Sequence, residues 1–251
     1  MDDNIRFLKE ITENNYQSIF DHPYLDMYRR LHEEYGICVQ LNLFYRMPGF
    51  DLSQMSARYR KEWENNSNWL KLSFHSEFEN IKPYESSGYD EVCLDCQKVH
   101  NQIERFASSS SLAGTTTIHY CLLTEDGIRA VKDNSVYGLL GLFGTQEQPR
   151  TSYGIGEDYA VRIRNGDVIK LGDISYASID IILNSFSTEE ILEKLELLAG
   201  RNSIRLMIHE QYFYRDYANH QPDFEAKLRS AFSFLIDMGY QSEFYENMIE
   251  S

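Results

Sequence analysis

The sequence predicts a single-domain α/β protein, a distorted (β/α) barrel similar to a TIM barrel, with seven to eight strands within residues 1–251. Short β-rich segments alternate with amphipathic helical segments along the chain, which is the order that builds a parallel sheet with helical crossovers. Polar residues follow nearly every predicted strand, whereas an open sheet would gather them at one switch point. No internal repeat, low-complexity segment or linker divides the chain.

The composition fits this class and excludes others. A length of 251 residues is normal for one α/β barrel, and 42% hydrophobic residues can form a sizeable core. Lys and Arg number 24 against 39 Asp and Glu, a net charge of −15. Because such a surface repels phosphate backbones and anionic lipids, we expect neither a nucleic-acid nor a membrane partner. The charge does not bear on a small ligand; the expected partner, a small-molecule or saccharide substrate, follows from the site residues below. The sequence leaves the oligomeric state open.

The sequence favours a cytoplasmic location. It has four cysteines, a low count that suits a reducing compartment, and Cys93 and Cys96, its only closely spaced pair, fall within a predicted helix. No stretch approaches the roughly 18 apolar residues that a membrane span needs, and no signal peptide is recognisable at the amino terminus.

Helix signals recur along the chain. Gly36 and Gly239 follow amphipathic segments as helix-ending glycines do, and Ser187 precedes an acidic first turn. The predicted helices cover residues 4–14, 24–35, 55–65, 88–107, 125–133, 158–164, 188–199 and 222–238, with loops over 80–87 and 147–156.

Strand signals lie between these helices. The predicted strands cover residues 37–44, 69–74, 115–119, 137–143, 174–183 and 204–208, with 241–245 as a candidate last strand. The sequence Asn165-Gly166-Asp167 predicts a hairpin turn that joins residues 161–164, or a ribbon around 168–171, to the strand 174–183.

The strand over residues 69–74 is the one around which we expect the functional site to form. Its alternating pattern stops at His75, and Glu77 and Glu79 follow within four residues. Other predicted strands also end in polar residues, namely Arg46, His119, Asp180, Asn184, His209 and Glu210. Three of the seven histidines therefore occupy the same topological position, which in a barrel opens onto one mouth. A single histidine at a strand end is more often structural; three with carboxylates indicate a polar functional site.

Imidazole and carboxylate groups are ordinary ligands of Zn²⁺ and similar ions. Such an ion lowers the pKa of a bound water to about 7 and makes it a nucleophile at neutral pH. The set therefore predicts metal-assisted hydrolysis.

The acidic pair Asp2-Asp3 has two interpretations. In the first, the pair stands at the end of the first barrel strand. Because only Met1 precedes the pair, that strand is then missing or very short, or the true start lies upstream. Alternatively, both residues form an acidic helix amino terminus, which the helix dipole favours.

Three ordered motifs resemble those of the polysaccharide deacetylase family, which are carbohydrate esterases with a distorted (β/α) barrel. The motifs are Asp2-Asp3, the run from His75 to Glu79, and Met207-Ile208-His209. They span most of the chain in the family's order, as a divergent branch would. The family's arginine and tryptophan motifs are not recognisable.

The resemblance implies a role for each matching residue. Asp2 matches the catalytic base and His209 the general acid, while Asp3 and His75 match metal ligands. Glu79 stands where the family has its second ligand histidine and is the third predicted ligand. His119 is interpreted as an added ligand or a substrate contact. Arg46, Asp180 and Glu210 are predicted to bind substrate.

The predicted function is a metal-dependent hydrolase of carbon–nitrogen amide bonds that deacetylates an N-acetylated sugar or a related small molecule. The predicted cofactor is a divalent ion, zinc first, with nickel, cobalt or manganese as alternatives. Two other functions stay open: a non-catalytic barrel that binds carbohydrate, and another metal-dependent sugar enzyme such as an isomerase or lyase.

Overall fold

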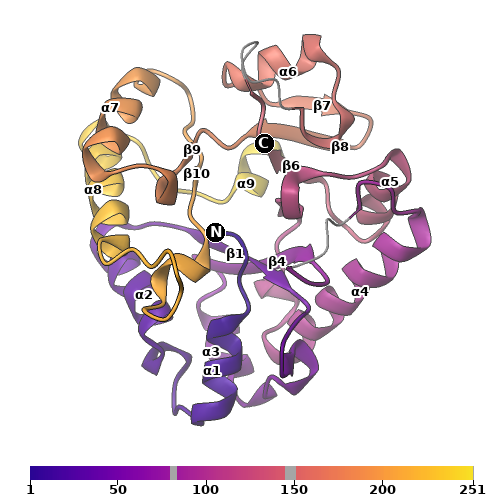
Figure 1. Cartoon of the computed structure of the whole chain (residues 1–251), viewed down its shortest axis with the longest axis vertical. Helices are drawn as coiled ribbons and strands as arrows, with labels where there is room; N and C mark the ends of the chain where they lie inside the picture. The colour runs from indigo at the N-terminus through magenta and orange to yellow at the C-terminus, as the bar shows by residue number, and fades with distance from the viewer. Residues whose placement is uncertain (80–83, 145–150, 251) are drawn as a thin grey trace.

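Helices form the outer part of the molecule in the computed structural model, which describes residues 1–79, 84–144 and 151–250 (Figure 1). Parts of the predicted loops over 80–87 and 147–156 lie outside the described residues. The α-helices are α1 Arg6–Asn14, α2 Pro23–Tyr35, α3 Arg60–Asn65, α4 Tyr89–Phe106, α5 Glu125–Asp133, α6 Glu157–Arg164, α7 Thr188–Leu198, α8 Phe224–Asp237 and α9 Tyr245–Glu250. The predicted helices are confirmed, except that residues 55–59 of the third contain a 3-10 turn instead of α-helix.

Local signals account for these boundaries. The Ser187 side chain accepts from the Glu190 amide, and the Glu190 side chain accepts from the Ser187 amide, so a capping box begins α7. Gly36 ends α2 in the left-handed conformation that glycine adopts without strain. The predicted strand at 241–245 is wrong, because residues 241–244 form no strand and α9 begins at Tyr245.

The strands are short and form separate sheets. Parallel strands β1 (Val39–Phe44) and β4 (Leu70–Ser76) make one sheet. A second has the order β5-β6-β8-β7, from Thr115–Thr116, Gly138–Gly141, Ile174–Ser178 and Ile169–Leu171. Strands β9 (Ile181–Ile182) and β10 (Leu206–Met207) pair in parallel, and β2 (Arg46–Met47) and β3 (Phe50–Asp51) form a hairpin. The fold is therefore mixed α/β, and the described strands do not form one closed sheet.

The first four residues of the chain lie between two of these sheets. Single parallel bridges pair Asp2 with His209 and Asn4 with Leu43. The Asp2 amide donates to the Ile208 carbonyl at 3.1 Å, and the Asn42 amide donates to the Met1 carbonyl at 2.8 Å. Residues 1–4 thus form a very short strand-like segment beside β1, and Asp2 and Asp3 precede helix α1 without belonging to it.

The hairpin in the second half of the chain is displaced from its predicted turn. Asn165 and Gly166 end helix α6, where the Gly166 amide donates to the Ile163 carbonyl. The antiparallel pair is β7 with β8, and its turn is at Gly172 and Asp173, with Gly172 at a φ of 61°. An Asn-Gly pair serves a helix end as well as a hairpin, because both need a flexible glycine.

Glu210 holds the start of helix α1. Its Oε2 atom accepts from the Ile5 and Arg6 amides at 2.7 and 3.0 Å, and Oε1 accepts from the Phe7 amide and the Tyr214 hydroxyl. Burial raises the pKa of Glu210 to about 7, although these four donors favour the ionised form. The carboxylate supplies acceptors for amides that a helix start leaves unpaired.

We expect Glu210→Gln to lower the free energy of unfolding by about 2–3 kcal/mol, because its amide NH₂ would face donors that now meet an oxygen. Chemical denaturation measures this change. The control, Glu196→Gln, alters an exposed side chain of α7 and should stay within about 0.5 kcal/mol of the wild type. Equal effects of the two substitutions would contradict this role of Glu210.

Candidate metal centre

His75 is the last residue but one of β4, within the strand and not beyond it. Parallel pairing with β1 buries β4, and a register shift between Leu43 and Phe44 turns the Phe44 ring against the His75 ring, with centroids 5.1 Å apart. The His75 side chain is almost fully buried. The sequence therefore located the strand correctly but ended it too early.

His119 reaches the same point from the segment after β5. It begins the short 3-10 helix η5 (His119–Cys121), in which Tyr120 and Cys121 both have left-handed φ angles, 60° and 56°. Non-glycine residues rarely adopt this conformation, and two in succession make a tight turn immediately after His119. The Phe44 ring packs edge-on against the His119 ring at 4.9 Å.

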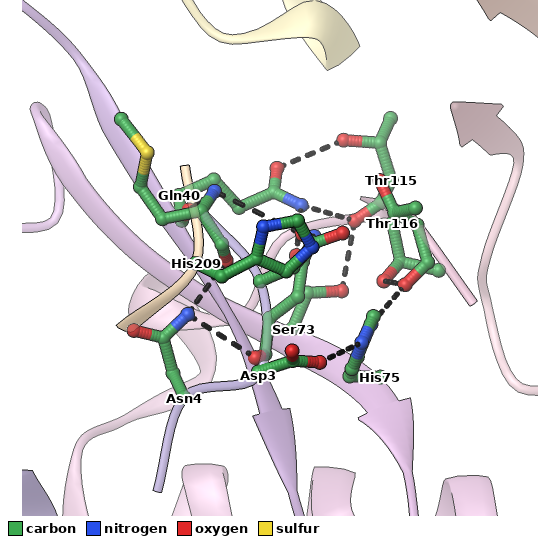
Figure 2. A network of polar contacts seen from close by, with 12 residues as sticks. Asp3, Asn4, Gln40, Ser73, His75, Thr115, Thr116 and His209 are labelled. Carbon is green, nitrogen blue, oxygen red and sulfur yellow. Dashed lines mark hydrogen bonds and ion pairs between the residues drawn. The ribbon is translucent and has the colours of Figure 1, made fainter. Parts of the chain in front are cut away.

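Three side chains converge at this point. The Nε2 atom of His75 lies 3.1 Å from Oδ1 of Asp3, Nδ1 of His119 lies 3.3 Å from the same oxygen, and the two nitrogens are 3.2 Å apart. Among the described residues, these three form the group of possible ligands whose atoms are close enough to hold one metal ion. Figure 2 shows the contact between Asp3 and His75 beneath a network of polar side chains that includes Ser73, Thr115 and Thr116.

Main-chain carbonyls orient both imidazoles. Nδ1 of His75 donates to the Thr117 carbonyl at 2.5 Å, and Nε2 of His119 donates to the Glu79 carbonyl at 2.9 Å. When a ring is neutral, it therefore turns a lone pair toward the Asp3 carboxylate; when it is protonated, the same nitrogen donates to that carboxylate. Metal-bound histidines commonly have such a partner on their second nitrogen, because it fixes the tautomer and the ring orientation.

The three atoms fit a divalent ion. Ligands at about 2.0–2.1 Å from a tetrahedral zinc lie about 3.3 Å from one another, which the three observed distances match. Two lone pairs and an anion that face each other also repel, unless a cation lies among them. Two imidazoles and one carboxylate suit zinc and several other first-row ions, so the donor set does not single out one metal.

A proton on an imidazole would also supply a positive charge at this point. Burial would lower the pKa of His75, but the Asp2 and Asp3 carboxylates outweigh it and raise this pKa. Burial also opposes ionisation of Asp3, yet hydrogen bonds from His119 and His75 hold the pKa of Asp3 well below its usual range. The Nε2 group of Gln211 donates to Oδ2 of Asp3 at 2.9 Å and fixes the carboxylate further.

Asp2 and His209 are close to the cluster in the fold. Their backbones pair directly, and the charges of both Asp2 and His209 influence groups in the cluster. Oδ1 of the buried Asp2 accepts from the Asn42 side chain at 2.7 Å. Nδ1 of His209 donates to Oδ1 of Asn184 at 2.8 Å, so Nε2 is the ring nitrogen that this bond does not use. Burial lowers the pKa of His209.

The other predicted site residues have different surroundings. Glu79 is exposed and its carboxylate is not one of the converging ligand atoms, although its charge interacts with Asp3 and His119. Its main-chain carbonyl accepts from His119. Arg46 is exposed and pairs with Glu77 at 3.3 Å. Asp180 is buried against Arg201 and Arg205. Like Glu210, which caps helix α1, Arg46 and Asp180 therefore already pair with other groups of the protein.

Sequence reasoning missed several contacts of the site. Asn184 could be recognised in the sequence as a polar residue that follows a predicted strand. Its hydrogen bond to His209 could not be predicted from the sequence. Gln211, Asn42 and Phe44 carry no motif, and only their three-dimensional positions show that they hold Asp3, Asp2 and the two imidazoles.

Comparison with known proteins identifies the fold only. No protein-family model matches the chain, and no curated protein matches it significantly. A 4-alpha-glucanotransferase from Thermococcus litoralis aligns over 99% of this chain at 11% identity with a TM-score of 0.60. A CE4 family pseudoenzyme from Bacillus anthracis, which has the polysaccharide deacetylase fold, aligns over 90% at 10% identity with a TM-score of 0.52.

The chain corresponds to only 38% and 60% of these two longer proteins. The likeness shows that the chain has a fold related to that of polysaccharide deacetylases and of the glucanotransferase. Within the described residues, no helix has both the length and the apolar character needed to cross a bilayer.

We expect purified protein saturated with zinc to retain about one equivalent after dialysis, because three ligand atoms converge. His119→Ala should lose this zinc, whereas Glu79→Ala should keep it, since the Glu79 carboxylate lies outside the cluster. Elemental analysis of both variants measures the difference. Zinc retained by His119→Ala and lost by Glu79→Ala would contradict this ligand set.

Proposed function

We propose that this protein is a metal-dependent hydrolase that removes an acetyl group from the nitrogen of an N-acetylated sugar or a related small molecule. The observation that carries this proposal is the triangle formed by Asp3, His75 and His119, with Asp2 and His209 beside it. A divalent ion held there would act as a Lewis acid on the amide carbonyl and lower the pKa of a water molecule.

We also propose that the strands, together with residues 1–4, are arranged as a distorted barrel in which seven chain segments lie side by side. Residues 1–4 connect β1 with the segment after β10, and the Leu72–Leu112 bridge connects β4 with the segment before β5. Strand β8 continues after two residues into β9, so one stretch of chain pairs with β6 and then with β10. These contacts support a ring of neighbouring strands that is interrupted in its hydrogen bonding, with the metal centre at one end.

In the proposed reaction, Asp2 accepts a proton from the attacking water. The water oxygen adds to the acetyl carbon, the carbon–nitrogen bond breaks, and acetate and a free amine are released. The bond between Asn42 and Oδ1 of Asp2 holds the carboxylate in position for this transfer.

His209 supplies the proton that the leaving nitrogen needs. Asn184 accepts from Nδ1 and so presents Nε2 for the transfer. Burial lowers the pKa of His209 while Asp3 and Asp2 act in the opposite direction, so the protonated ring is a stronger acid than a solvated imidazole.

A ring-shaped polar substrate is favoured by the aromatic side chains at the site. Tyr120 is 46% exposed, and its ring lies 4.2 Å from that of His119. The ring centroid of Tyr212 lies 6.3 Å from that of His209. Tyrosine offers a flat apolar face together with a hydroxyl, which suits a sugar.

A second candidate is a barrel that binds carbohydrate without turnover. The similarity in fold to a protein described as a pseudoenzyme favours it. It predicts saturable saccharide binding that metal removal does not change, and no release of acetate.

We expect acetate release from a panel of N-acetylated mono- and oligosaccharides to fall at least about 100-fold in Asp2→Asn and in His209→Gln, because each removes a proton-transfer group. Both variants should keep their bound zinc. The control His32→Gln alters a histidine of α2 that stacks on Trp69 and should keep its activity. Full activity in either site variant would contradict the assigned role, and zinc-loaded wild type without activity on any substrate would favour the binding protein.

A further inference from the structure

A cavity of about 230 Å³ is lined by residues that precede β1 and β10 and by residues within or just after β1, β5, β6 and β8. Its wall includes Cys38, which precedes β1, Arg205, which precedes β10, and Tyr245, the first residue of α9. Asp2 and Thr117 also line it, so it extends toward the metal centre. Because one water needs only about 10–15 Å³ on this measure, the cavity has room for a small organic molecule.

Arg205 is a poorly compensated charged group of this cavity. Its side chain is about nine-tenths buried, and its Nε and Nη1 atoms have no hydrogen-bond partner among the described residues. Only Nη2 donates, to the Ser203 hydroxyl at 2.8 Å. A guanidinium stays protonated in proteins, so these N–H groups call for an acceptor.

The carboxylate of Asp180 compensates the charge of Arg205 only in part. Asp180 accepts from Nη1 of Arg201 and from the backbone amide of Arg205 at 2.9 and 2.8 Å. Its distance to the Arg205 guanidinium is longer, 3.6 Å. Two guanidinium groups therefore share one carboxylate, which leaves an excess positive charge in a chain whose net charge is −15. A poorly paired buried charge is costly, and an anion would compensate it.

Tyr245 adds a second polar group without a partner. Its buried hydroxyl makes no hydrogen bond within the described part of the chain, and its ring lies 5.6 Å from the Arg205 guanidinium. The neighbouring Glu246 ties α9 to the rest of the fold through Lys71 and the Gly114 amide. The segment that carries Tyr245 is thus held firmly over the cavity.

We propose that this cavity holds a second ligand site, which shares none of the three metal ligands and binds a small molecule through one carboxylate on Arg205 and Tyr245. Two features favour a single carboxylate over a phosphate. Arg205 is one guanidinium with unpaired N–H groups, whereas the Met1 ammonium on the same wall already donates to the Gln40 carbonyl. Two carboxylates, Asp2 and Glu243, also line the cavity and repel a more highly charged ligand.

The test is isothermal titration calorimetry on protein treated with a chelator, so that no metal can hold the probe. The probes are acetate, lactate and glucuronate, with inorganic phosphate and neutral acetamide for comparison. We expect saturable binding of at least one carboxylate at one site per chain, weakened at least tenfold in Arg205→Gln and severalfold in Tyr245→Phe. Arg162→Gln, which alters an exposed arginine paired with Asp167, should bind as the wild type does.

Four results would overturn the proposal: no binding of any carboxylate, phosphate binding as tightly as a carboxylate, equal binding of acetamide, or unchanged binding in both cavity variants. If Arg205→Gln does not fold, Tyr245→Phe decides, because it removes only the hydroxyl. His75→Ala disrupts the metal centre and should retain carboxylate binding, so failure of the proposed hydrolase and failure of this site can be told apart.

Discussion

The pairing of residues 1–4 with two neighbouring segments is the constraint on which the site depends. Hydrogen bonds join this segment to residues 42–44 on one side and to residues 208–210 on the other. Glu210 then anchors the next three amides, so the backbone is held on both sides of Asp3. Asp3 itself has a φ of 59°, a conformation that aspartate tolerates better than most residues do. The metal ligand is thus placed by main-chain contacts made far away in the sequence.

The same principle governs the two imidazoles. Each ring donates to a backbone carbonyl, and Phe44 packs against both, so their lone pairs converge before any ligand arrives. Rings prepared in this way lose little freedom on binding, which favours affinity. The Asp2 and Asp3 carboxylates outweigh burial and raise the pKa of His75, and a metal ion competes with a proton for this ring, so that metal affinity and proton affinity are linked. Asp2 belongs to the same electrostatic arrangement, because its charge is one of those that raise the pKa of His75 against the effect of burial.

The helices were predictable because capping residues and apolar faces are local signals, as Ser187 and Gly36 show. Strands of two to four residues, such as β5 and β10, carry too little pattern to give their boundaries. His75 was predicted as a ligand from its position at a strand end and from the family resemblance, whereas Asp3 was predicted as a ligand from the resemblance alone. His119 was recognised as either a ligand or a substrate contact, and its place depends on two left-handed residues that no sequence pattern announces. Glu79 was expected as a ligand from its spacing, but the chain after β4 turns its side chain toward solvent.

The most direct test of the metal centre is the position of zinc in crystals of the zinc-loaded protein, located by anomalous diffraction at the zinc edge. The account predicts one dominant peak within about 2.0–2.2 Å of Oδ1 of Asp3, Nε2 of His75 and Nδ1 of His119. A dominant peak elsewhere, or no peak at this cluster when zinc is in excess, would contradict it. In that case the convergence of these three side chains would serve only the packing of the site.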